Sequence, residues 1–500
     1  MNPKIIIVTE FPFVDPEPTE IGPYNYLSEF MDVALTSNGI EGTTFSPTEP
    51  IEAENAKSAI DALVDNICAQ LTPDRLNLIG ISMYSATARY GFELAARLKK
   101  RANKARTDIM IIGGGSLFYK QSLIRDGKTI ADSIDFALAQ NASNGIPILD
   151  GAVFGGLQAF IDISRQIGKG NISKNEVFFP TKLPNGYYFK ENGIVRGSGI
   201  SLAAHMDYAP FEITQFPSGK FKISAMYSNL CQNACYFCRN GVPIRFSTDQ
   251  VKYGIKNLIA QLGGDKEKVK YLYQCDPNPF SPINRAHTDE CMEIVDSEIG
   301  HTLQKIVFYD SALFADPEQV IVDTTKWGIR QYGIGRETAT EHAASFIGEK
   351  YCGRIKTQDM LDAERRGIEE VVGRVKKLGK RIAFELYYII SPNDTAETLN
   401  QTFDEMGHFA AMTDNCTIIA IKFALLSPNP GTTTLSQNVD LICQDSYATK
   451  TSYDRWDGNA ITRLYPNSVF PMLKRNPLFS DYSDTWQYNP TFHKAVKELH

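Results

Sequence analysis

The sequence predicts an α/β protein in which an N-terminal doubly wound, Rossmann-like domain precedes a partial (β/α)6 barrel and a C-terminal cap. Apolar runs of strand length alternate with amphipathic stretches of helix length, which is typical of parallel sheets covered by helices. The chain has 500 residues, too many for one hydrophobic core, so two or three domains are expected. A segment with paired Asn-Gly turns separates two such series of strands.

The first domain is expected to span residues 1–170. Its predicted strands lie at 4–11, 42–47, 76–84, 107–118 and 132–138. Its predicted helices lie at 24–38, 52–70, 91–102 and 151–167. Most of these strands are continuous apolar runs, as in parallel strands that are buried on both faces. Their alternation with helices predicts an open, doubly wound sheet.

The second series of strands is expected to follow a connector. Residues 171–220 are assigned to this connector, and NGYYFKENGIV within it predicts a small hairpin. Six strands are predicted within residues 221–434, at 222–230, 269–280, 305–314, 329–339, 381–392 and 416–432. This spacing predicts a partial α/β barrel, whose functional residues gather at the carboxyl ends of the strands. Residues 435–500 show no regular period and are expected to cap the barrel mouth.

Composition excludes several classes of protein. The net charge is −7 with both signs interspersed, which argues against a nucleic-acid partner. No apolar run approaches transmembrane length, and the apolar stretch at the N-terminus is too short for a signal peptide. The nine cysteines, an odd number without a secretion signal, are expected to be reduced thiols in the cytoplasm.

The run CQNACYFC carries the strongest chemical signal, because Cys231, Cys235 and Cys238 form a C-x3-C-x2-C triplet. Three thiolates on one short loop can bind three irons of a [4Fe–4S] cube and leave the fourth iron open to a small-molecule ligand. A structural zinc site would need a fourth Cys or His at suitable spacing, and none is near in the sequence. Three packed free cysteines are the plainer alternative.

The triplet resembles that of the radical S-adenosylmethionine (SAM) enzymes, and Phe237 occupies the position where that family usually carries an aromatic residue. The resemblance covers about 221–434. Glu337 follows the fourth barrel strand, and Ser391 and Asn393 follow the fifth, where relatives carry SAM-binding residues. The resemblance implies that these three residues lie near SAM and that Phe237 lies near its adenine. The Pro-Gly-Thr turn in SPNPGTTTL, at 427–435, resembles the turn after the sixth strand in the cobalamin-linked and methylthiolating branches.

The family's chemistry implies a mechanism and partners. One electron reduces the cluster and cleaves SAM to a 5′-deoxyadenosyl radical, which abstracts hydrogen from a substrate carbon. A flavodoxin- or ferredoxin-type protein is the implied electron donor, and a peptide or natural product is the implied substrate. A non-enzymatic iron–sulfur redox module is a minor alternative.

The N-terminal domain resembles the cobalamin-binding domain of one branch of the family, on the basis of IGISMYSATARYGFELAARLKK followed by IMIIGGGSLF. The resemblance implies a crevice lined by hydroxyls and glycines: Ser82, Ser85, Thr87, Gly113, Gly114 and Gly115. No D-x-H-x-x-G motif for ligating the cofactor occurs. The alternative is therefore a domain that keeps the fold without the cofactor, as a scaffold or a peptide-docking surface.

Two further cysteines are candidates for catalysis. Cys275 follows the second barrel strand, and Cys352 follows a short helix-like stretch after Glu337. A thiol can donate a hydrogen atom to a carbon radical, although simple packing explains most lone cysteines. Three carboxylates lie at or near strand ends: Asp276, Asp310 and Glu385. They could bind a peptide backbone, the SAM ribose or a basic group, or they could be solvated loop acids. Glu385 could instead pair with Arg or Lys inside the barrel.

Two reactions are compatible with these features. In the first, the radical epimerises a peptide Cα from L to D, and a cysteine returns hydrogen to the opposite face. In the second, methylcobalamin donates a methyl group to the substrate radical. The missing cobalamin motif and the strand-end thiols favour epimerisation, with C-methylation as the alternative.

Overall fold

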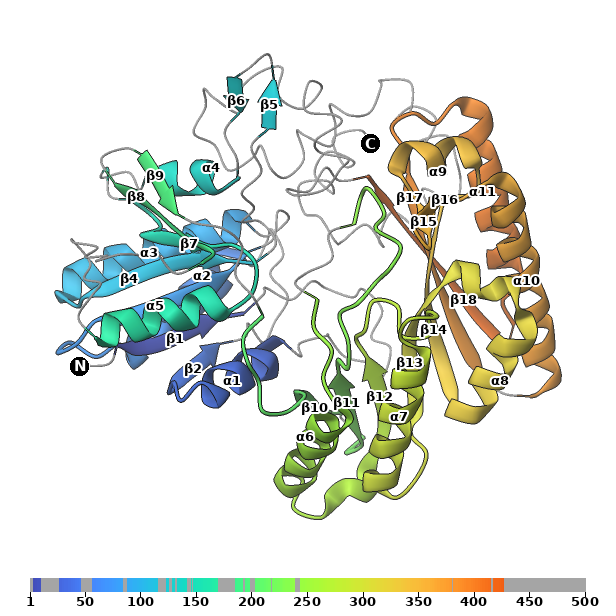
Figure 1. Ribbon diagram of the computed structural model, residues 1–500, viewed down its shortest axis with the longest axis horizontal. Coiled ribbons are helices and arrows are strands. Elements are labelled where there is room, and N and C mark those ends of the chain that lie inside the picture. The colour runs from blue at the N-terminus through green and yellow to red at the C-terminus, as the bar shows by residue number, and fades with distance from the viewer. Residues whose placement is uncertain are drawn as a thin grey trace.

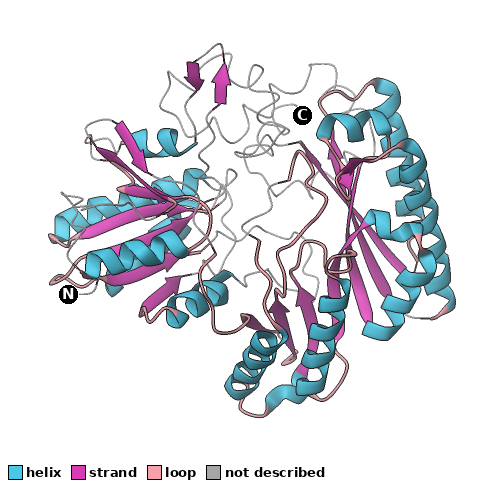
Figure 2. Ribbon diagram, in the orientation of Figure 1, coloured by secondary structure: helices cyan, strands magenta, loops and turns pink. Residues whose placement is uncertain are grey.

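The structure, a computed structural model, is described for residues 3–9, 27–45, 56–83, 88–115, 123–125, 128–130, 133–141, 145, 147–169, 185–191, 194–197, 203–216, 218–238, 243–379, 381–414 and 417–426. These residues form two seven-stranded sheets, the first at the left and the second at the right of Figure 1. Helices cover both sheets (Figure 2). The predicted α/β class is confirmed.

The first sheet has the strand order β2-β1-β3-β4-β7-β8-β9. Five strands are parallel: β1 (Lys4–Val8), β2 (Gly42–Phe45), β3 (Asn77–Ser82), β4 (Ile109–Gly114) and β7 (Gly151–Val153). The hairpin of β8 (Tyr187–Glu191) and β9 (Ile194–Gly197) adds two antiparallel strands. In chain order the parallel strands read 2-1-3-4-5, the flavodoxin-like doubly wound topology.

Both faces of the first sheet are buried. Ile6 and Val8 of β1 share a core with α2 (Ala56–Gln70) and α3 (Ala88–Ala105). Ile5 and Ile7 share a second core with α1 (Leu27–Ser37) and α5 (Gln158–Gly168). Because side chains alternate between the faces of a strand, burial of both faces requires the continuous apolar run seen in the sequence.

Two predicted elements of this domain were wrong. Residues 132–138 were expected to form a strand, and the structure has helix α4 (Ser133–Ala139) there. Ile134, Ala137 and Leu138 are buried at i, i+3 and i+4, which is helical spacing. The fifth parallel strand is β7, at the start of the segment 151–167 that was predicted to be wholly helical. A small ladder of β5 (Leu123–Arg125) and β6 (Lys128–Ile130) was not predicted.

The second sheet has the order β10-β11-β12-β13-β14-β17-β18. Its six parallel strands are β11 (Phe221–Ala225), β12 (Val269–Gln274), β13 (Gln304–Asp310), β14 (Ile329–Glu337), β17 (Ile382–Ile390) and β18 (Thr417–Leu425). All six were predicted. The edge strand β10 (Phe211–Gln215) pairs with β11 in antiparallel fashion. Within the described residues the sheet does not close on itself, so the barrel is partial.

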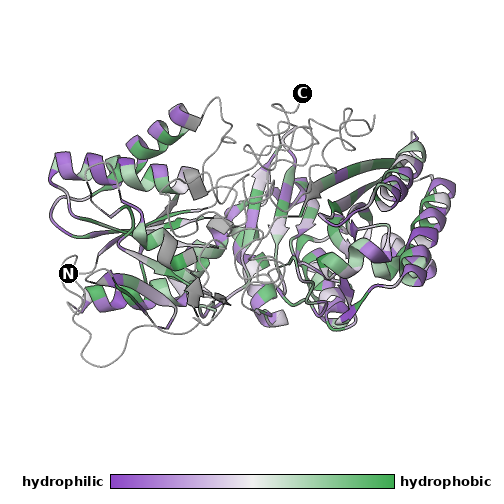
Figure 3. Ribbon diagram, turned by 90° about the horizontal axis from the view of Figure 1, so that it is seen from above, coloured by the Kyte–Doolittle hydropathy of each residue, from purple (hydrophilic) through white to green (hydrophobic). Residues whose placement is uncertain are grey.

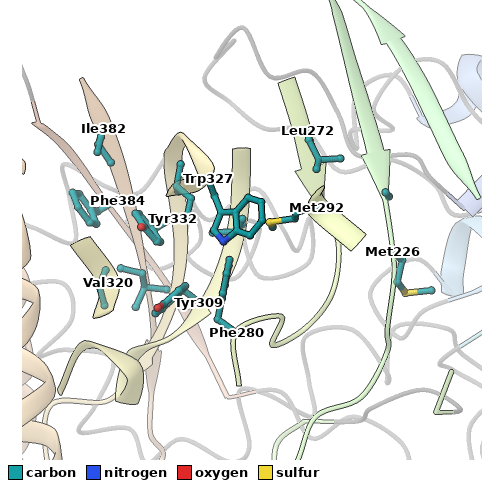
Figure 4. Packing of buried hydrophobic residues seen from close by; sticks show 14 of the residues in the cluster. Met226, Leu272, Phe280, Met292, Tyr309, Val320, Trp327, Tyr332, Ile382 and Phe384 are labelled. Atoms are coloured by element: carbon teal, nitrogen blue, oxygen red, sulfur yellow. The ribbon is translucent and has the colours of Figure 1, made fainter. Parts of the chain in front are cut away.

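The helices of the second unit pack on one face of its sheet. They are α6 (Thr248–Gln261), α7 (Arg285–Ile299), α8 (Pro317–Trp327), α10 (Gln358–Lys377) and α11 (Ala396–Ala411), with the short turns η1 (Asp265–Lys268) and η2 (Ser311–Ala315). Aromatic and aliphatic side chains pack together in the core between them (Figure 4): Tyr332 stacks on Phe384 with ring centroids 5.5 Å apart, and Tyr309 meets Tyr332 edge-on at 5.4 Å. Such pairs stabilise beyond their buried area.

The opposite face of this sheet, inside the barrel, is partly polar. The strand register places Phe308, Gly333 and Glu385 side by side, and Asp310, Gly335 and Tyr387 in the next row. Glu385 Oε1 lies 3.4 Å from Lys422 Nζ, and Tyr387 Oη donates to Glu385 Oε2 at 2.7 Å. Glu385 is therefore paired with a lysine inside the barrel, which was one of the sequence alternatives.

An insertion after β14 was only partly anticipated. Helix α9 (Glu341–Ile347) corresponds to the expected helix-like stretch, but the hairpin of β15 (Lys350–Tyr351) and β16 (Arg354–Ile355) was not predicted. Two-residue strands have no period that a sequence pattern can display.

Helix α1 joins the two units. Its residues Val33 and Ala34 belong to the barrel core together with Ala209. Asn38 Nδ2, just beyond the helix, donates to the carbonyl oxygen of His205 at 2.9 Å, and Figure 1 shows α1 beside α6 and β10. Seen from above, polar residues gather on the outer helices and apolar residues on the strands (Figure 3). No helix in the described part of the chain is long and apolar enough to cross a membrane.

Candidate active site

The loop that carries the three cysteines leaves β11 at the carboxyl edge of the second sheet. Asp276, just after β12, accepts the N–H of Tyr227 at 2.7 Å. Asn284 Nδ2 donates to the carbonyl oxygen of Leu230 at 2.8 Å. Burial raises the pKa of Asp276 to about 7, and the backbone N–H donors oppose this rise. The strand-end acid Asp276 thus holds the start of the loop.

The three cysteines are free thiols on a sharply bent loop. Cys231 and Cys235 are partly buried and Cys238 is exposed. Ala234 has φ +54°, in the left-handed region, and the N–H of Cys238 donates to the carbonyl oxygen of Cys235 at 3.2 Å. Among the described residues, no three Cys, His, Asp or Glu side chains converge closely enough to hold one metal ion. A cube needs no such convergence, because each thiolate binds a different iron.

The segment 348–355, which we call the clasp, packs against the cysteine loop. The N–H of Tyr236 donates to the carbonyl oxygen of Gly348 at 3.1 Å. Gly348 has φ +63°, and a Cβ there would lie 2.0 Å from the Tyr236 ring, so only glycine fits. Lys350 Nζ lies 4.2 Å from the centroid of the same ring.

The clasp also reaches a predicted cluster ligand directly. The N–H of Lys350 donates to Cys235 Sγ at 3.3 Å. Burial raises the pKa of the Cys235 thiol, the carboxylates of Glu349 and Glu337 raise it further, and the Lys350 N–H opposes the rise. The thiol therefore keeps its proton until a metal displaces it, which is how cysteine ligands behave when binding and deprotonation are coupled. These residues fit an iron–sulfur cluster.

The structure brings Cys352 to the cysteine loop. Cys352 is exposed at the turn of the clasp hairpin and has φ +50°. Its N–H donates to Asn233 Oδ1 at 3.1 Å, and its Sγ accepts a hydrogen bond from Gln232 Nε2 at 2.9 Å. Gln232 and Asn233 both lie between Cys231 and Cys235.

Cys275 lies in a different setting. It directly follows β12, its N–H donates to the carbonyl oxygen of Ala225 at 2.8 Å, and it packs against the barrel core. Burial raises the pKa of its thiol, with Asp276 adding to the rise and Lys222 opposing it. These neighbours lie on or directly after barrel strands, and none of them belongs to the clasp.

Glu337 ends β14 in a strained conformation. Its φ is +57°, and the register with β17 shifts between Gly335 and Glu337. A Cβ on Gly335 would lie 2.8 Å from Glu337 Oε1, so the carboxyl group folds over this glycine. The pKa of Glu337 is raised to about 8, mainly by burial, with the carboxylate of Glu349 adding to the rise and Lys356 opposing it. Backbone strain of this kind costs about 1–3 kcal/mol and clusters at functional sites.

The turn after β17 completes the rim. Ser391 Oγ donates to Asn393 Oδ1 at 2.5 Å, and the N–H of Ser391 donates to Asp394 Oδ2 at 2.8 Å. His342 Nε2, on α9, lies 2.9 Å from the carbonyl oxygen of Asn393. His342 was not predicted. Phe237 is partly buried against the barrel core.

A buried charge network, also missed from the sequence, lies behind this rim. Arg336 Nε lies 2.9 Å from Glu405 Oε1, and Arg336 Nη1 lies 3.1 Å from Glu364 Oε2. Lys356 Nζ lies 3.0 Å from Glu364 Oε1 and 2.7 Å from Glu349 Oε1. An arginine inside an apolar strand was the signal available, since a buried cation requires buried partners.

In the first sheet, the predicted crevice residues lie at the carboxyl edge. Ser82 ends β3, and Gly113 and Gly114 end β4, next to the β1/β3 switch point where doubly wound sheets bind ligands. A Cβ on Gly114 would lie 2.9 Å from Val153, so packing also requires a small residue there. The predicted Ser85 and Thr87, the turn at 427–435 and the cap at 435–500 lie outside the described residues.

Two solved structures resemble the whole arrangement. The radical SAM methyltransferase TsrM from Kitasatospora setae, solved with cobalamin and a [4Fe–4S] cluster, has a TM-score of 0.53 and 15% identity, over 88% of this chain and 75% of TsrM. The cobalamin-dependent SAM radical enzyme OxsB has a TM-score of 0.55 and 12% identity, over 88% of this chain. This chain has the fold of cobalamin-dependent radical SAM enzymes. The predicted order of a Rossmann-like domain and a radical SAM barrel is confirmed.

The similarity to these proteins does not extend to the whole length of OxsB or to the level of sequence. The chain spans 55% of OxsB, about half of that protein. No protein-family model matches the sequence, and no curated protein matches it. The shared feature is therefore the fold, and activity is argued below from the site.

Proposed function

We propose that this chain is a radical SAM enzyme whose [4Fe–4S] cluster is held by Cys231, Cys235 and Cys238. One observation carries the proposal: the cysteine triplet lies on a loop at the carboxyl edge of the six parallel strands of the barrel sheet. Asp276 fixes this loop on one side and the clasp fixes it on the other. That edge is where α/β barrels place their chemistry.

The chain's own residues have separable tasks in this reaction. When bound, the cluster and SAM supply one-electron cleavage of SAM to a 5′-deoxyadenosyl radical. Glu337, whose carboxyl folds over Gly335 at the barrel mouth, is suited to bind the cationic amino group of SAM. Ser391 and Asn393 offer hydroxyl and amide groups at the neighbouring strand end, and Phe237 offers an aromatic surface for the adenine. Phe308 and Tyr387, whose ring centroids lie 6.5 Å apart on the otherwise partly polar inner face, would limit the access of water to the reacting groups.

We propose methyl transfer with cobalamin as the reaction. The expected peptide epimerisation finds no support in the comparisons, whereas TsrM is a methyltransferase with bound cobalamin and OxsB is cobalamin-dependent. The flavodoxin-like order of the first sheet supports a cofactor crevice at Ser82, Gly113 and Gly114. The peptide or natural-product substrate and the flavodoxin- or ferredoxin-type electron donor stay predictions.

The first test concerns the cluster. The chain is purified without oxygen, reconstituted with iron and sulfide, reduced and mixed with SAM, and 5′-deoxyadenosine is measured. Cys235→Ala should lose both iron and 5′-deoxyadenosine formation. Cys68→Ala, a matched control at a partly buried thiol in the first unit, should retain both. Equal iron content in the two variants would refute the cluster assignment.

The second test concerns the reaction. The methyltransferase should retain hydroxocobalamin through gel filtration and pass an isotopically labelled methyl group from SAM to product. Epimerisation is favoured by one observation, the exposed Cys352 thiol held beside the cysteine loop. A chain that retains no corrinoid, and that takes up deuterium from heavy water into a peptide product in a manner dependent on Cys352, would be an epimerase.

A further inference from the structure

Asn233 connects the cysteine loop to two other parts of the barrel. It lies between Cys231 and Cys235, and its side chain is buried, with 8% of the residue's surface exposed. Its Nδ2 donates to Oδ2 of Asp310, the last residue of β13. Its Oδ1 accepts the N–H of Cys352 in the clasp at 3.1 Å. One short amide side chain therefore bridges a barrel strand and the clasp.

Asp310 is a rigid partner for this amide. Its Oδ2 also accepts a hydrogen bond from Asn278 Nδ2 at 3.2 Å, and its Oδ1 accepts the N–H of Ala312 at 3.0 Å. Lys356 Nζ lies 3.9 Å from the same carboxylate and ties it to the buried charge network. Because both oxygens are engaged, Asp310 presents a fixed acceptor to Asn233.

The remaining clasp contacts act on the same stretch of loop. Gln232 bonds Cys352 Sγ, Tyr236 bonds the carbonyl oxygen of Gly348, and Cys235 Sγ accepts the N–H of Lys350. Residues 232–236 are thus held on two sides before any metal binds. The side chain of Asn233 makes the contact that reaches into the barrel interior.

We propose that Asn233 is a positioning residue for the cluster. It locks the cysteine loop between Asp310 and the clasp, so that the three thiols are presented to iron in a preformed arrangement. This inference rests on the proposed function, since it assumes that the cluster binds at these cysteines. Groups that orient metal ligands typically change metal affinity about 10- to 100-fold when they are mutated.

The decisive variant is Asn233→Asp, which places a second carboxylate against Asp310. Iron loss from the reconstituted protein to a chelator should become about tenfold faster or more. Asn400→Asp is the matched control: it makes the same substitution at an exposed position of α11, outside the cysteine loop and the clasp. It should lose iron at nearly the wild-type rate, because the contact between Asn233 and Asp310 stays intact.

A swap tests the contact itself. In Asn233→Asp with Asp310→Asn, the introduced carboxylate still accepts the N–H of Cys352, and the introduced amide donates to it. Within the described part of the chain, Asn278 Oδ1 is buried without a hydrogen-bond partner, so the Asn278 amide can flip and its oxygen can accept the second N–H of the new amide. The swap should therefore recover most of the iron retention that Asn233→Asp loses.

Hydrogen exchange on the metal-free chain separates this inference from the proposed function. Backbone N–H groups of residues 231–238 should exchange faster in Asn233→Asp than in the wild type or the swap, whether or not a cluster can be assembled. If Asn233→Asp does not fold, Asn233→Ser, which shortens the bridge without adding charge, takes its place. The proposal would be overturned if Asn233→Asp exchanged its amide hydrogens and lost iron at the same rates as the wild type. It would also be overturned if the swap lost iron as fast as Asn233→Asp.

Discussion

The two sheets differ in the polarity of their faces. In the first sheet, β1 alternates Ile5 and Ile7 into one core and Ile6 and Val8 into another, so both faces are dry. In the second, one face of β17 packs Phe384 against the helices, while the other carries Glu385 and Tyr387. The difference separates a sheet whose two faces only pack, and whose carboxyl edge we propose as the cofactor crevice, from a barrel sheet that has one partly polar face.

The same contrast holds at the carboxyl edges. The first sheet ends in the small residues Ser82 and Gly114, and Gly114 must be small because it packs against Val153. The second ends in the strained Glu337 and in Asp310, whose carboxylate accepts a hydrogen bond from Asn233 of the cysteine loop. The barrel edge is therefore built by specific polar contacts, each of which a single substitution can remove.

The largest effect is expected from the buried charge network. Arg336→Met should destabilise the barrel by about 3–5 kcal/mol, because it leaves the buried carboxylates of Glu405 and Glu364 without this counter-charge. The measurement is the shift of the barrel's unfolding transition in denaturant. Arg330→Met, on the same strand but in an exposed contact with the carbonyl oxygen of Arg381, is the matched control and should change little.

Ile6→Ala sharpens this comparison from the other sheet. Truncating a fully buried isoleucine costs about 2–5 kcal/mol, so the free energy of unfolding should decrease about as much as in Arg336→Met. Ile6→Ala should destabilise the first unit and leave iron retention unchanged. Loss of iron in Ile6→Ala, or an unchanged barrel stability in Arg336→Met, would contradict this difference between the first sheet and the barrel.

The fold was largely predictable because its signals are local. Most buried strands of both sheets are continuous or alternating apolar runs, and β1 to β4 of the first sheet and all six parallel barrel strands were predicted. The failures are short: α4 has seven residues, β7 has three, and β15 has two. Elements of that length take their conformation from tertiary packing.

The site divides in the same way. The spacing of Cys231, Cys235 and Cys238 is a local pattern, so it could be recognised. The roles of Asn233 and Lys350 depend on contacts with residues 119 and 115 positions away, respectively, and nothing in their own neighbourhoods indicates them. Asp276 and Asp310 could be placed at strand ends, but only the structure shows that they hold the loop.

A pH effect of intermediate size is expected from Asp276. Burial raises its pKa from 3.8 to about 7, so the folded chain keeps a proton that the unfolded chain releases between these values. Stability should therefore fall as pH rises from about 4 to about 7 and level off above that. Asp276→Asn should flatten this slope, as measured by unfolding midpoints across the pH range, although Glu337 contributes in the same direction.

The control for this pH effect is Asp265→Asn, at an exposed carboxyl in η1, which should keep the wild-type profile. A slope that survives in Asp276→Asn would assign it to the other buried carboxyls. Glu29, on α1 of the first unit, contributes a slope of the same sign because burial raises its pKa to about 7, so only the part that Asp276→Asn removes is assigned to the barrel.

The smallest effect concerns the hydrogen bond from the clasp to the cluster. The N–H of Lys350 points to Cys235 Sγ, outside the hairpin pairing, so Lys350→Pro removes this donor without breaking the hairpin. Such a bond stabilises the reduced, more negative cluster, and its loss should lower the reduction potential. A hydrogen bond with a net value of about 0.5–1.5 kcal/mol corresponds to about 20–60 mV for one electron.

Lys350→Ala is the matched control, because it also removes the ammonium group near Tyr236 but keeps the N–H. Potentials measured by spectroelectrochemical titration should fall in the order wild type, Lys350→Ala, Lys350→Pro. The step between the two variants isolates the single N–H, since both lack the lysine charge. Equal potentials in the two variants would mean that the clasp acts on the cluster only by holding its loop in place.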